Sequence, residues 1–414
     1  MMLPPPVQPR PPQVPPMNLP DFFRSATPDA TAVIAGDSSI RYAELEHRVN
    51  TLAGHLHNLG VGSGGYVGVA LDRSIELIVS LLAIVKTGGA YIPLDPGYPQ
   101  ARLDQMIASS GLKQILTLGK LADRFPTVDC VRVDEGITSG PDSDTMKLEA
   151  GGNDPLYAIF TSGSTGQPKA ATVFRKGFAN LLAWYSRELS LGPNDRTLVI
   201  SSPSFDLTQK NFFAPFATGG TLVLDDCKTY DISRISKLIA DHGITLINCT
   251  PSAFYPLVDA AAAGGYSALA SLRLVVLGGE PISVSRLRAW LKHPSCKAEV
   301  MNSYGPTECT DICAFHRLHR GNLDEFPFVP LGKEIDHVEV SIRDDDFKML
   351  LDGELGELCI SGAGVGGGYL HDPARTSERF VAGIYKTGDL ARRLPCGTLE
   401  FRGRADHQVK VNGF

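Results

Sequence analysis

The chain has 414 residues, of which 43% are apolar and 20% are charged, and its formal net charge at pH 7 is −6. This composition is typical of a globular protein, and the length predicts more than one subdomain. The negative charge, without a long basic run, argues against a nucleic-acid or anionic-membrane surface, and no apolar stretch reaches the ~18 residues that a membrane span needs.

The first residues of the chain predict a leader rather than a folded element. Residues 1 to 20 contain nine prolines, and we expect a disordered or polyproline-like segment there. The sequence shows no charged segment followed by an apolar one, so it predicts no secretion signal. Eight cysteines are scattered without a CxxC pair, which favours reduced thiols. We therefore expect a cytoplasmic protein.

Apolar periodicity predicts alternating helices and strands between residues 42 and 292. Helices are expected over 42–59, 75–86, 176–189, 232–242, 257–262 and 284–292. Strands are expected over 66–71, 90–94, 114–117, 197–200, 221–224, 246–249 and 272–277, with strand-like apolar runs at 157–160 and 298–301. This alternation favours an α/β fold with a mostly parallel sheet.

The pattern changes after residue 325. Short alternating segments at 338–343, 357–361 and 399–404 are separated by Gly, Pro and Asp turns, which predicts a smaller all-β unit. We therefore divide the chain into a leader (1–20), an α/β core of two subdomains (21–325), a β-rich unit (326–405) and a short end (406–414).

The most informative segment is TSGSTGQPK, which runs from Thr161 to Lys169 directly after an apolar run. Backbone N–H groups and hydroxyls of such a loop can surround phosphate oxygens, and the lysine supplies positive charge. The segment lacks the Gly-Lys-Ser/Thr ending of a Walker A loop. Because it is expected between an apolar strand and a helix, we interpret it as a phosphate-binding loop rather than a linker.

Two further motifs carry weaker signals. NSYGPTE (302–308) places an aromatic ring before a tight Gly-Pro turn, and the carboxylate of Glu308 just beyond it can hold Mg²⁺. YKTGDL (385–390) contains Asp389, whose carboxylate can accept hydrogen bonds from two ribose hydroxyls. Taken singly, each motif is also compatible with an ordinary turn.

Taken together, in this order and spacing, these motifs resemble those of the adenylate-forming superfamily of acyl-CoA synthetases, luciferases and amino-acid adenylation domains of nonribosomal peptide synthetases. The resemblance covers about residues 21–414 and is strongest for the peptide-synthetase branch. The matching segments are RYAEL (41–45), LLAIVKTGGAYIPLDPGYPQAR (81–102), TSGSTGQPK, SFDLTQ (204–209), GGEPIS (278–283), NSYGPTE, GELGELCISGAGVGGGYL (353–370), YKTGDL and GRADHQVKVNGF (403–414). The resemblance implies an α/β fold with two mostly parallel sheets flanked by helices, plus a small distorted β-barrel subdomain.

The chain departs from this family in two places. In the family, the last matching segment is a hinge at the position of Asp406, and a small C-terminal subdomain with the adenylation lysine follows it. Here the chain ends at Phe414, so we expect the N-terminal core alone. Such a core should bind its aminoacyl-adenylate yet form it at least ~100-fold more slowly than the full-length protein. The second departure is Ala170-Ala171, where the family has Gly-Val.

The resemblance implies ATP-dependent activation of an amino acid as its aminoacyl-adenylate, followed by transfer to the phosphopantetheine thiol of a carrier protein. ATP and Mg²⁺ are the implied cofactors, and a small activator protein is a further candidate partner. The initial methionine, with no condensation-domain remnant before the core, favours a loading module or a freestanding domain. The alternatives are an acyl- or aryl-CoA ligase and a non-catalytic nucleotide-binding module.

The resemblance also assigns roles to residues of the nucleotide site. Expected contacts to the β- and γ-phosphates are Thr161, Ser162, Gly163, Ser164, Thr165, Gly166 and Lys169. Gly278, Gly279 and Glu280 are expected to line the adenine slot, with Tyr304 stacked on the ring and Asn302 at its edge. Thr307 is expected at the α-phosphate, Glu308 at Mg²⁺, Asp389 at the ribose and Arg404 at the ribose or phosphate. Thr165, Lys169, Thr307 and Glu308 are the catalytic candidates.

The amino-acid pocket is expected around Asp206, which matches the carboxylate that holds the substrate's α-amino group. A buried carboxylate needs such a cationic partner, although an Asx-type turn is the alternative for this position. The other implied pocket residues are Phe205, Leu207, Lys210, Ser252, Val276, Gly278, Ser303, Asp311 and Ile312. Lys210 and Asp311 either recognise a polar or charged side chain or neutralise one another, and we expect a polar or charged side chain.

Overall fold

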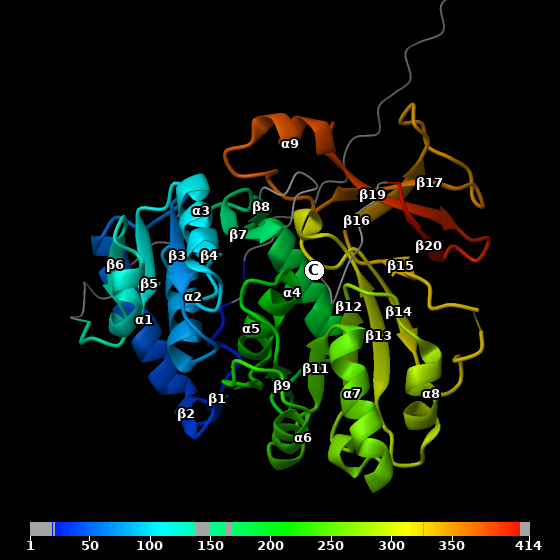
Figure 1. The fold of residues 1–414 in the computed structure, drawn as a ribbon, viewed down its shortest axis with the longest axis horizontal. Helices are drawn as coiled ribbons and strands as arrows, with labels where there is room; N and C mark the ends of the chain where they lie inside the picture. The colour runs from blue at the N-terminus through cyan, green and yellow to red at the C-terminus, as the bar shows by residue number, and fades with distance from the viewer. Residues whose placement is uncertain (1–18, 20, 138–149, 162–167, 326, 406–414) are drawn as a thin grey trace, which may run out of the picture.

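The computed structural model describes residues 19, 21–137, 150–161, 168–325 and 327–405. Within these ranges the chain forms a six-stranded sheet and a nine-stranded sheet, both flanked by helices, and a five-stranded antiparallel sheet (Figure 1). The expected fold class of two mostly parallel sheets with an added β unit is therefore confirmed. The expected leader, apart from Leu19, and the expected hinge lie outside the described residues.

The six-stranded sheet is parallel except for its last strand pair. Its strands follow the order β6 (Asp129–Arg132), β5 (Gln114–Thr117), β3 (Tyr66–Ala70), β4 (Ala90–Pro93), β7 (Pro155–Thr161) and β8 (Lys169–Phe174). Helix α3 (Gln100–Ser110) packs Leu103, Met106 and Ile107 into a core cluster with apolar side chains of these strands. Burial on both faces explains why these strands read as continuous apolar runs.

The predicted phosphate-binding segment has a different setting from the one expected. β7 and β8 pair antiparallel, with Thr161 opposite Lys169, so the segment joins two strands. The expectation that it leads directly into a helix is wrong, because helix α4 (Arg175–Glu188) begins only after β8. The first residues of β8, Lys169-Ala170-Ala171, are small or charged and give little strand signal in the sequence.

The nine-stranded sheet has a parallel centre with antiparallel strands at both edges. Its strands follow the order β15 (Lys333–Glu334), β14 (Ala314–Leu318), β13 (Glu299–Tyr304), β12 (Leu274–Gly278), β11 (Leu246–Cys249), β9 (Arg196–Val199), β10 (Thr221–Leu224), β1 (Thr31–Ala35) and β2 (Ser38–Arg41). β15 lies beyond the expected boundary at residue 325, and the domain boundaries stay predictions.

Four helices contribute to the layer between the two parallel sheets, where the largest core cluster lies (Figure 1). They are α1 (Tyr42–Asn58), α2 (Ile75–Lys86), α4 and α5 (Asp206–Thr218). The outer face of the nine-stranded sheet packs against α6 (Ile232–Asp241), α7 (Pro251–Ala261) and α8 (Val284–Lys292). α7 begins at Pro251 rather than at Leu257, because the Thr250 side chain caps it and a proline suits the first helical position.

The third sheet is antiparallel and lies across one end of the nine-stranded sheet, next to helix α9 (Pro373–Arg379) (Figure 1). Its strands are β16 (Val338–Arg343), β17 (Gly356–Gly362), β18 (Phe380–Val381), β19 (Ile384–Arg393) and β20 (Leu399–Arg404). The YKTGDL motif therefore lies inside β19 and not in a turn. Among the described helices, none combines the length and apolarity needed to cross a membrane.

Candidate functional site

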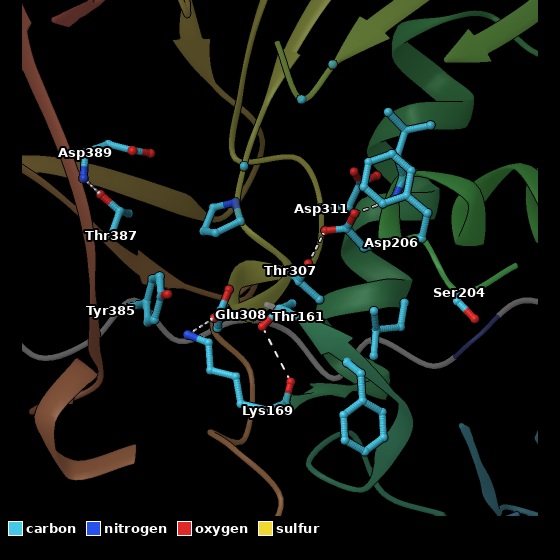
Figure 2. A pocket seen from close by; sticks show the side chains of 18 of the residues that line it. Thr161, Lys169, Ser204, Asp206, Thr307, Glu308, Asp311, Tyr385, Thr387 and Asp389 are labelled. Atoms are coloured by element: carbon cyan, nitrogen blue, oxygen red, sulfur yellow. Dashed lines mark hydrogen bonds and ion pairs between the residues drawn. The ribbon is translucent and has the colours of Figure 1, made fainter. Parts of the chain in front are cut away.

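A pocket lies where the carboxyl ends of strands from both parallel sheets meet the five-stranded sheet (Figure 2). Such strand ends are the usual place for ligand sites in open α/β sheets. The sequence-predicted residues that line it are Thr161, Lys169, Phe205, Asp206, Leu207, Gly278, Gly279, Ser303, Thr307, Glu308, Asp311, Asp389 and Arg404. The pocket therefore brings together residues from nearly every predicted motif.

One region of the pocket holds a hydrogen-bonded cluster of Lys169, Glu308 and Tyr369. The Lys169 ammonium donates to the Tyr369 hydroxyl at 2.6 Å and lies 3.1 Å from Oε1 of Glu308. The Tyr369 hydroxyl donates to the same oxygen at 2.7 Å. The Lys169 side chain is 18% exposed, so its charge borders the pocket. An ammonium in this position is suited to an anionic ligand.

Glu308 is ionised in this cluster, and a carboxylate of this kind can hold a divalent cation. Burial alone would raise the pKa of this carboxyl, but Lys169 and the Tyr369 hydroxyl outweigh burial and lower the pKa. The described residues contain no group of three or more metal-binding side chains. A Mg²⁺ ion at Glu308 would therefore take most of its ligands from phosphate oxygens and water, which is its usual coordination in nucleotide sites.

Asp206 is the first residue of α5, and its carboxylate faces the pocket beside Thr307 (Figure 2). The Thr307 hydroxyl donates to Oδ2 of Asp206, and the Leu207 backbone N–H donates to Oδ1 at 2.8 Å. The second bond satisfies a helix N-terminal amide and matches the preference for negative charge at this end of a helix. The alternative of an Asx-type turn therefore explains the bond from the Leu207 amide, but it does not explain the bond from Thr307.

The surroundings of Asp206 compensate its negative charge only in part, because its two hydrogen bonds and the nearby Lys210 charge do not outweigh the effect of burial on its pKa. The residue is 8% exposed and makes no ion pair within the described part of the chain. Burial, and then the neighbouring charge of Asp311, raise the pKa of this carboxyl to about 6. A cationic group in the pocket would restore the ionised form and relieve this cost.

Lys210, one helical turn after Asp206, forms a buried ion pair with Asp311. Its ammonium lies 2.5 Å from Oδ2 of Asp311 and donates to the Leu207 carbonyl at 2.9 Å. The Lys210 side chain is fully buried, whereas Asp311 lines the pocket. Of the two alternatives for these residues, the wall ion pair is the arrangement present in this structure.

Asp389 lies on β19, at the opposite side of the pocket from Asp206 (Figure 2). Its Oδ2 accepts from the Tyr304 hydroxyl at 2.5 Å, and its Oδ1 accepts from the Arg404 guanidinium at 2.7 Å. These two bonds fix the orientation of the carboxylate, and each oxygen keeps a further lone pair for a ligand hydroxyl. Asp389, Tyr304 and Arg404, predicted from separate motifs, thus form one hydrogen-bonded group.

Several predicted residues do not line the pocket. Glu280 accepts from the backbone N–H and hydroxyl of Ser252 at 3.0 and 2.9 Å, so these two residues meet at the start of α7. Asn302 donates to the Pro330 carbonyl at 2.8 Å. The remaining ones are Lys210, Val276, Tyr304 and Ile312. Their expected contacts with nucleotide or substrate stay predictions, as do the roles of the lining residues. Ser162, Gly163, Ser164, Thr165, Gly166 and Asp406 lie outside the described residues.

The pocket also contains residues to which the motifs assigned no role. These are Tyr98, Arg102, Ile159, Phe160, Ser204, Gly305, Pro306, Arg379, Tyr385 and Thr387. Tyr98 and Arg102 close a matched segment, and Tyr385 and Thr387 belong to YKTGDL, so a sequence signal was present for them. Arg379, at the end of α9, lies outside every matched segment.

Comparisons with known proteins point to one family. A family model described as AMP-binding enzyme matches residues 22–370. Surfactin synthase subunit 2 of Bacillus subtilis (strain 168) is 36% identical over 402 residues, which cover 94% of this chain and 11% of that protein. The chain therefore spans a small part of the length of this relative.

Two solved structures of the nonribosomal peptide synthetase FmoA3 share the fold. The AMPPNP-bound form has a TM-score of 0.86 and 31% identity, and the match covers 95% of this chain and 43% of that chain. The form bound to alpha-methyl-L-serine-AMP has a TM-score of 0.85 and 31% identity, with coverage of 92% and 44%.

Proposed function

This chain belongs to the AMP-binding enzyme family, and we propose on that basis that it activates an amino acid with ATP, forming an aminoacyl-adenylate and pyrophosphate. The observation that carries the proposal is Asp206, a buried carboxylate that faces the pocket without an ion-pair partner in the described part of the chain. An α-ammonium group compensates this charge, whereas the acyl or aryl group of a CoA-ligase substrate would not. FmoA3, a relative with a similar fold, binds an aminoacyl-adenylate, which supports the same assignment.

In the proposed reaction the substrate carboxylate attacks the α-phosphate in line, and the protein positions the two anions and screens their repulsion. Asp206 would hold the α-ammonium at one end, and Asp389 would accept hydrogen bonds from the ribose at the other. Thr307 lies between them (Figure 2), and in this proposal its hydroxyl would contact the α-phosphate. Lys169 would neutralise charge on the phosphates. Glu308 would hold Mg²⁺, which supplies further charge neutralisation.

The proposed partners follow from the second half-reaction of the family. The adenylate would be transferred to the phosphopantetheine thiol of a carrier protein, and the substrate side chain would be polar or charged. The transfer to a carrier protein is proposed from the peptide-synthetase relatives. The polar or charged side chain is proposed from Ser303 and the Lys210–Asp311 pair at the pocket. The activator protein and the cytoplasmic location stay predictions.

The decisive experiment compares two non-hydrolysable ligands by calorimetry. One is an aminoacyl-sulfamoyl-adenosine, and the other is the same molecule without its α-amino group. If Asp206 holds the ammonium, the first should bind at least ~100-fold more tightly, since a buried unpaired charge costs about 3–5 kcal/mol. Equal affinities would point to the CoA-ligase alternative, and no binding of either would remove the adenylate site altogether.

The raised pKa of Asp206 predicts a pH dependence of this binding. Below about pH 6 the free protein holds a proton on Asp206, and that proton must leave before an ammonium can pair with the carboxylate. Affinity for an aminoacyl-sulfamoyl-adenosine should therefore rise about tenfold from pH 5 to pH 7 and fall again above about pH 8, where the ligand's α-ammonium loses its proton. The substitution Asp206→Asn should remove the rise, which calorimetry at several pH values would measure.

Replacing Asp389 with Ala should weaken the binding of AMP without unfolding the protein. The ribose hydroxyls lose a charged acceptor, which is worth roughly 1.5–3 kcal/mol for each bond. Calorimetry with AMP measures the loss, and thermal melting reports on the fold. Asp352→Ala, at an exposed position of the same β unit, is the matched control. Equal AMP affinity in both variants would exclude Asp389 from the nucleotide site.

A further inference from the structure

We infer that the substrate side chain is uncharged and donates a hydrogen bond to Asp311, because Lys210 already neutralises this wall of the pocket. This inference rests on the proposed function and narrows its substrate class. Three charged groups meet at this end of the pocket: Asp206, Asp311 and Lys210. Figure 2 shows Asp206 and Asp311 side by side, with Asp389 on the far side of the cavity.

In this arrangement the Lys210 ammonium cannot form an ion pair with the substrate side chain. Its side chain is fully buried, and its ammonium bonds to Asp311 and to the Leu207 carbonyl. The Tyr185 ring lies 5.6 Å from the same ammonium. A substrate carboxylate would have to displace Asp311 to reach Lys210 and would meet the Asp311 charge first. An acidic side chain is therefore disfavoured.

Asp311 is held in place by its backbone as well as by Lys210. Thr310 and Asp311 are consecutive non-glycine residues with φ of +62° and +64°, a conformation that a β-branched threonine adopts only under strong constraint. The Thr310 hydroxyl donates to the Gly364 carbonyl at 2.6 Å, which fixes this turn. The backbone of Asp311 is thus fixed by this turn, and the ion pair with Lys210 orients its carboxylate.

The charge balance at this end excludes a second cation on the substrate. Asp206 and Asp311 carry two negative charges, Lys210 carries one positive charge, and the α-ammonium of an amino acid supplies the other. These four charges cancel. A basic side chain would add an uncompensated positive charge, so lysine-like or ornithine-like substrates are disfavoured too.

What remains at the wall is hydrogen-bonding capacity. Oδ1 of Asp311 accepts no hydrogen bond from the residues that the structure describes, and it lies in a residue that lines the pocket. Gly278 and Ser303 line the same pocket, and a Cβ at Gly278 would lie 2.6 Å from the Ser303 hydroxyl oxygen. A hydroxyl or carboxamide on the substrate side chain would satisfy Asp311, whereas an apolar side chain would leave it without a donor.

The test measures how tightly ligands with different side chains bind to the protein and to variants that lack the charge of Lys210 or Asp311. Aminoacyl-sulfamoyl-adenosines with seryl, asparaginyl, aspartyl, ornithyl and leucyl groups are titrated into the protein by calorimetry. A seryl or asparaginyl ligand should bind at least about tenfold more tightly than each of the other three. Lys210→Met leaves Asp311 uncompensated, so the ornithyl ligand should gain at least about tenfold relative to the seryl ligand. Asp311→Leu leaves Lys210 uncompensated, so the aspartyl ligand should gain at least about tenfold relative to the seryl ligand.

A single variant can fail to fold, because it leaves a buried charge unpaired. The double variant Lys210→Met with Asp311→Leu removes both charges and should favour the leucyl ligand over the seryl one. A wild-type preference for a charged or apolar ligand would overturn the inference while leaving the proposed function intact, and so would an unchanged profile in the folded variants. Failure of every ligand to bind would contradict the proposed function itself.

Discussion

Replacing Asp206 with Ala should weaken binding of an aminoacyl-sulfamoyl-adenosine by ~3–5 kcal/mol, the usual cost of leaving one member of a buried charge pair alone. The carboxylate is buried, and its contacts in the free protein are the Thr307 hydroxyl and the Leu207 amide. In the variant, neither the Thr307 hydroxyl nor the Leu207 amide carries a negative charge that could pair with the ligand's ammonium. Calorimetry would measure the loss as a change in dissociation constant of at least ~100-fold.

Two controls separate this effect from damage to the site. The affinity for adenosine, which lacks the α-phosphate expected at Thr307, should stay unchanged in Asp206→Ala, because Asp389, the expected ribose contact, lies on the other side of the pocket (Figure 2). The ligand without its α-amino group should bind the variant at least as well as the wild type, since no ammonium is left unpaired. An unchanged affinity for the aminoacyl ligand would overturn the amino-acid assignment.

Helices and strands with one clear period could be predicted from the sequence almost to the residue. α2 and α8 begin and end where expected, and so do β5, β10, β11, β16 and β20. Most have a continuous or periodic apolar pattern, and each has a Gly, Pro or charged residue at its end or within the next two positions. Local pattern and global fold agree in these elements.

The elements that sequence reasoning missed have identifiable physical causes. α5 is buried on nearly all sides and contains Pro215, so it has no polar face and carries a helix-breaking residue. β19 contains Gly388 with φ of +75° and a register shift after Leu390, which in sequence resembles a turn. These features depend on packing against other elements, which a single sequence does not display.

The site likewise contains residues that could be predicted from the sequence and contacts that could not. Motif spacing identified Asp206, Glu308 and Asp389, which the fold brings to one pocket. The partners of these residues could not be predicted, because Tyr369 reaches Lys169 and Glu308 from the segment between β17 and α9, which forms a bridge to β8 at Ala171. Likewise the motifs left two alternatives for Lys210 and Asp311, and only their distance in the fold distinguishes them.

Replacing Gly305 with Ala should destabilise the protein by at least ~3 kcal/mol and weaken adenylate binding at the same time. A Cβ at Gly305 would lie 2.1 Å from the carbonyl oxygen of Asp311, 2.8 Å from its carbonyl carbon and 2.9 Å from the Cys313 nitrogen. All three are backbone atoms, so no side-chain rotation can relieve the overlap, and the strained Thr310–Asp311 turn must move. Thermal or denaturant unfolding would measure the loss of stability.

The matched control for this substitution is Gly192→Ala. A Cβ there meets no atom within 4 Å, so the change should be neutral or stabilise slightly by restricting the unfolded chain. Because Gly305 precedes Thr307 and contacts the Asp311 turn, its variant should also lose affinity for an aminoacyl-sulfamoyl-adenosine at temperatures where it remains folded. Equal stability of the two alanine variants would mean that the turn accommodates a side chain at Gly305. The rigid placement of Asp311 on which the inferred substrate class depends would then not hold.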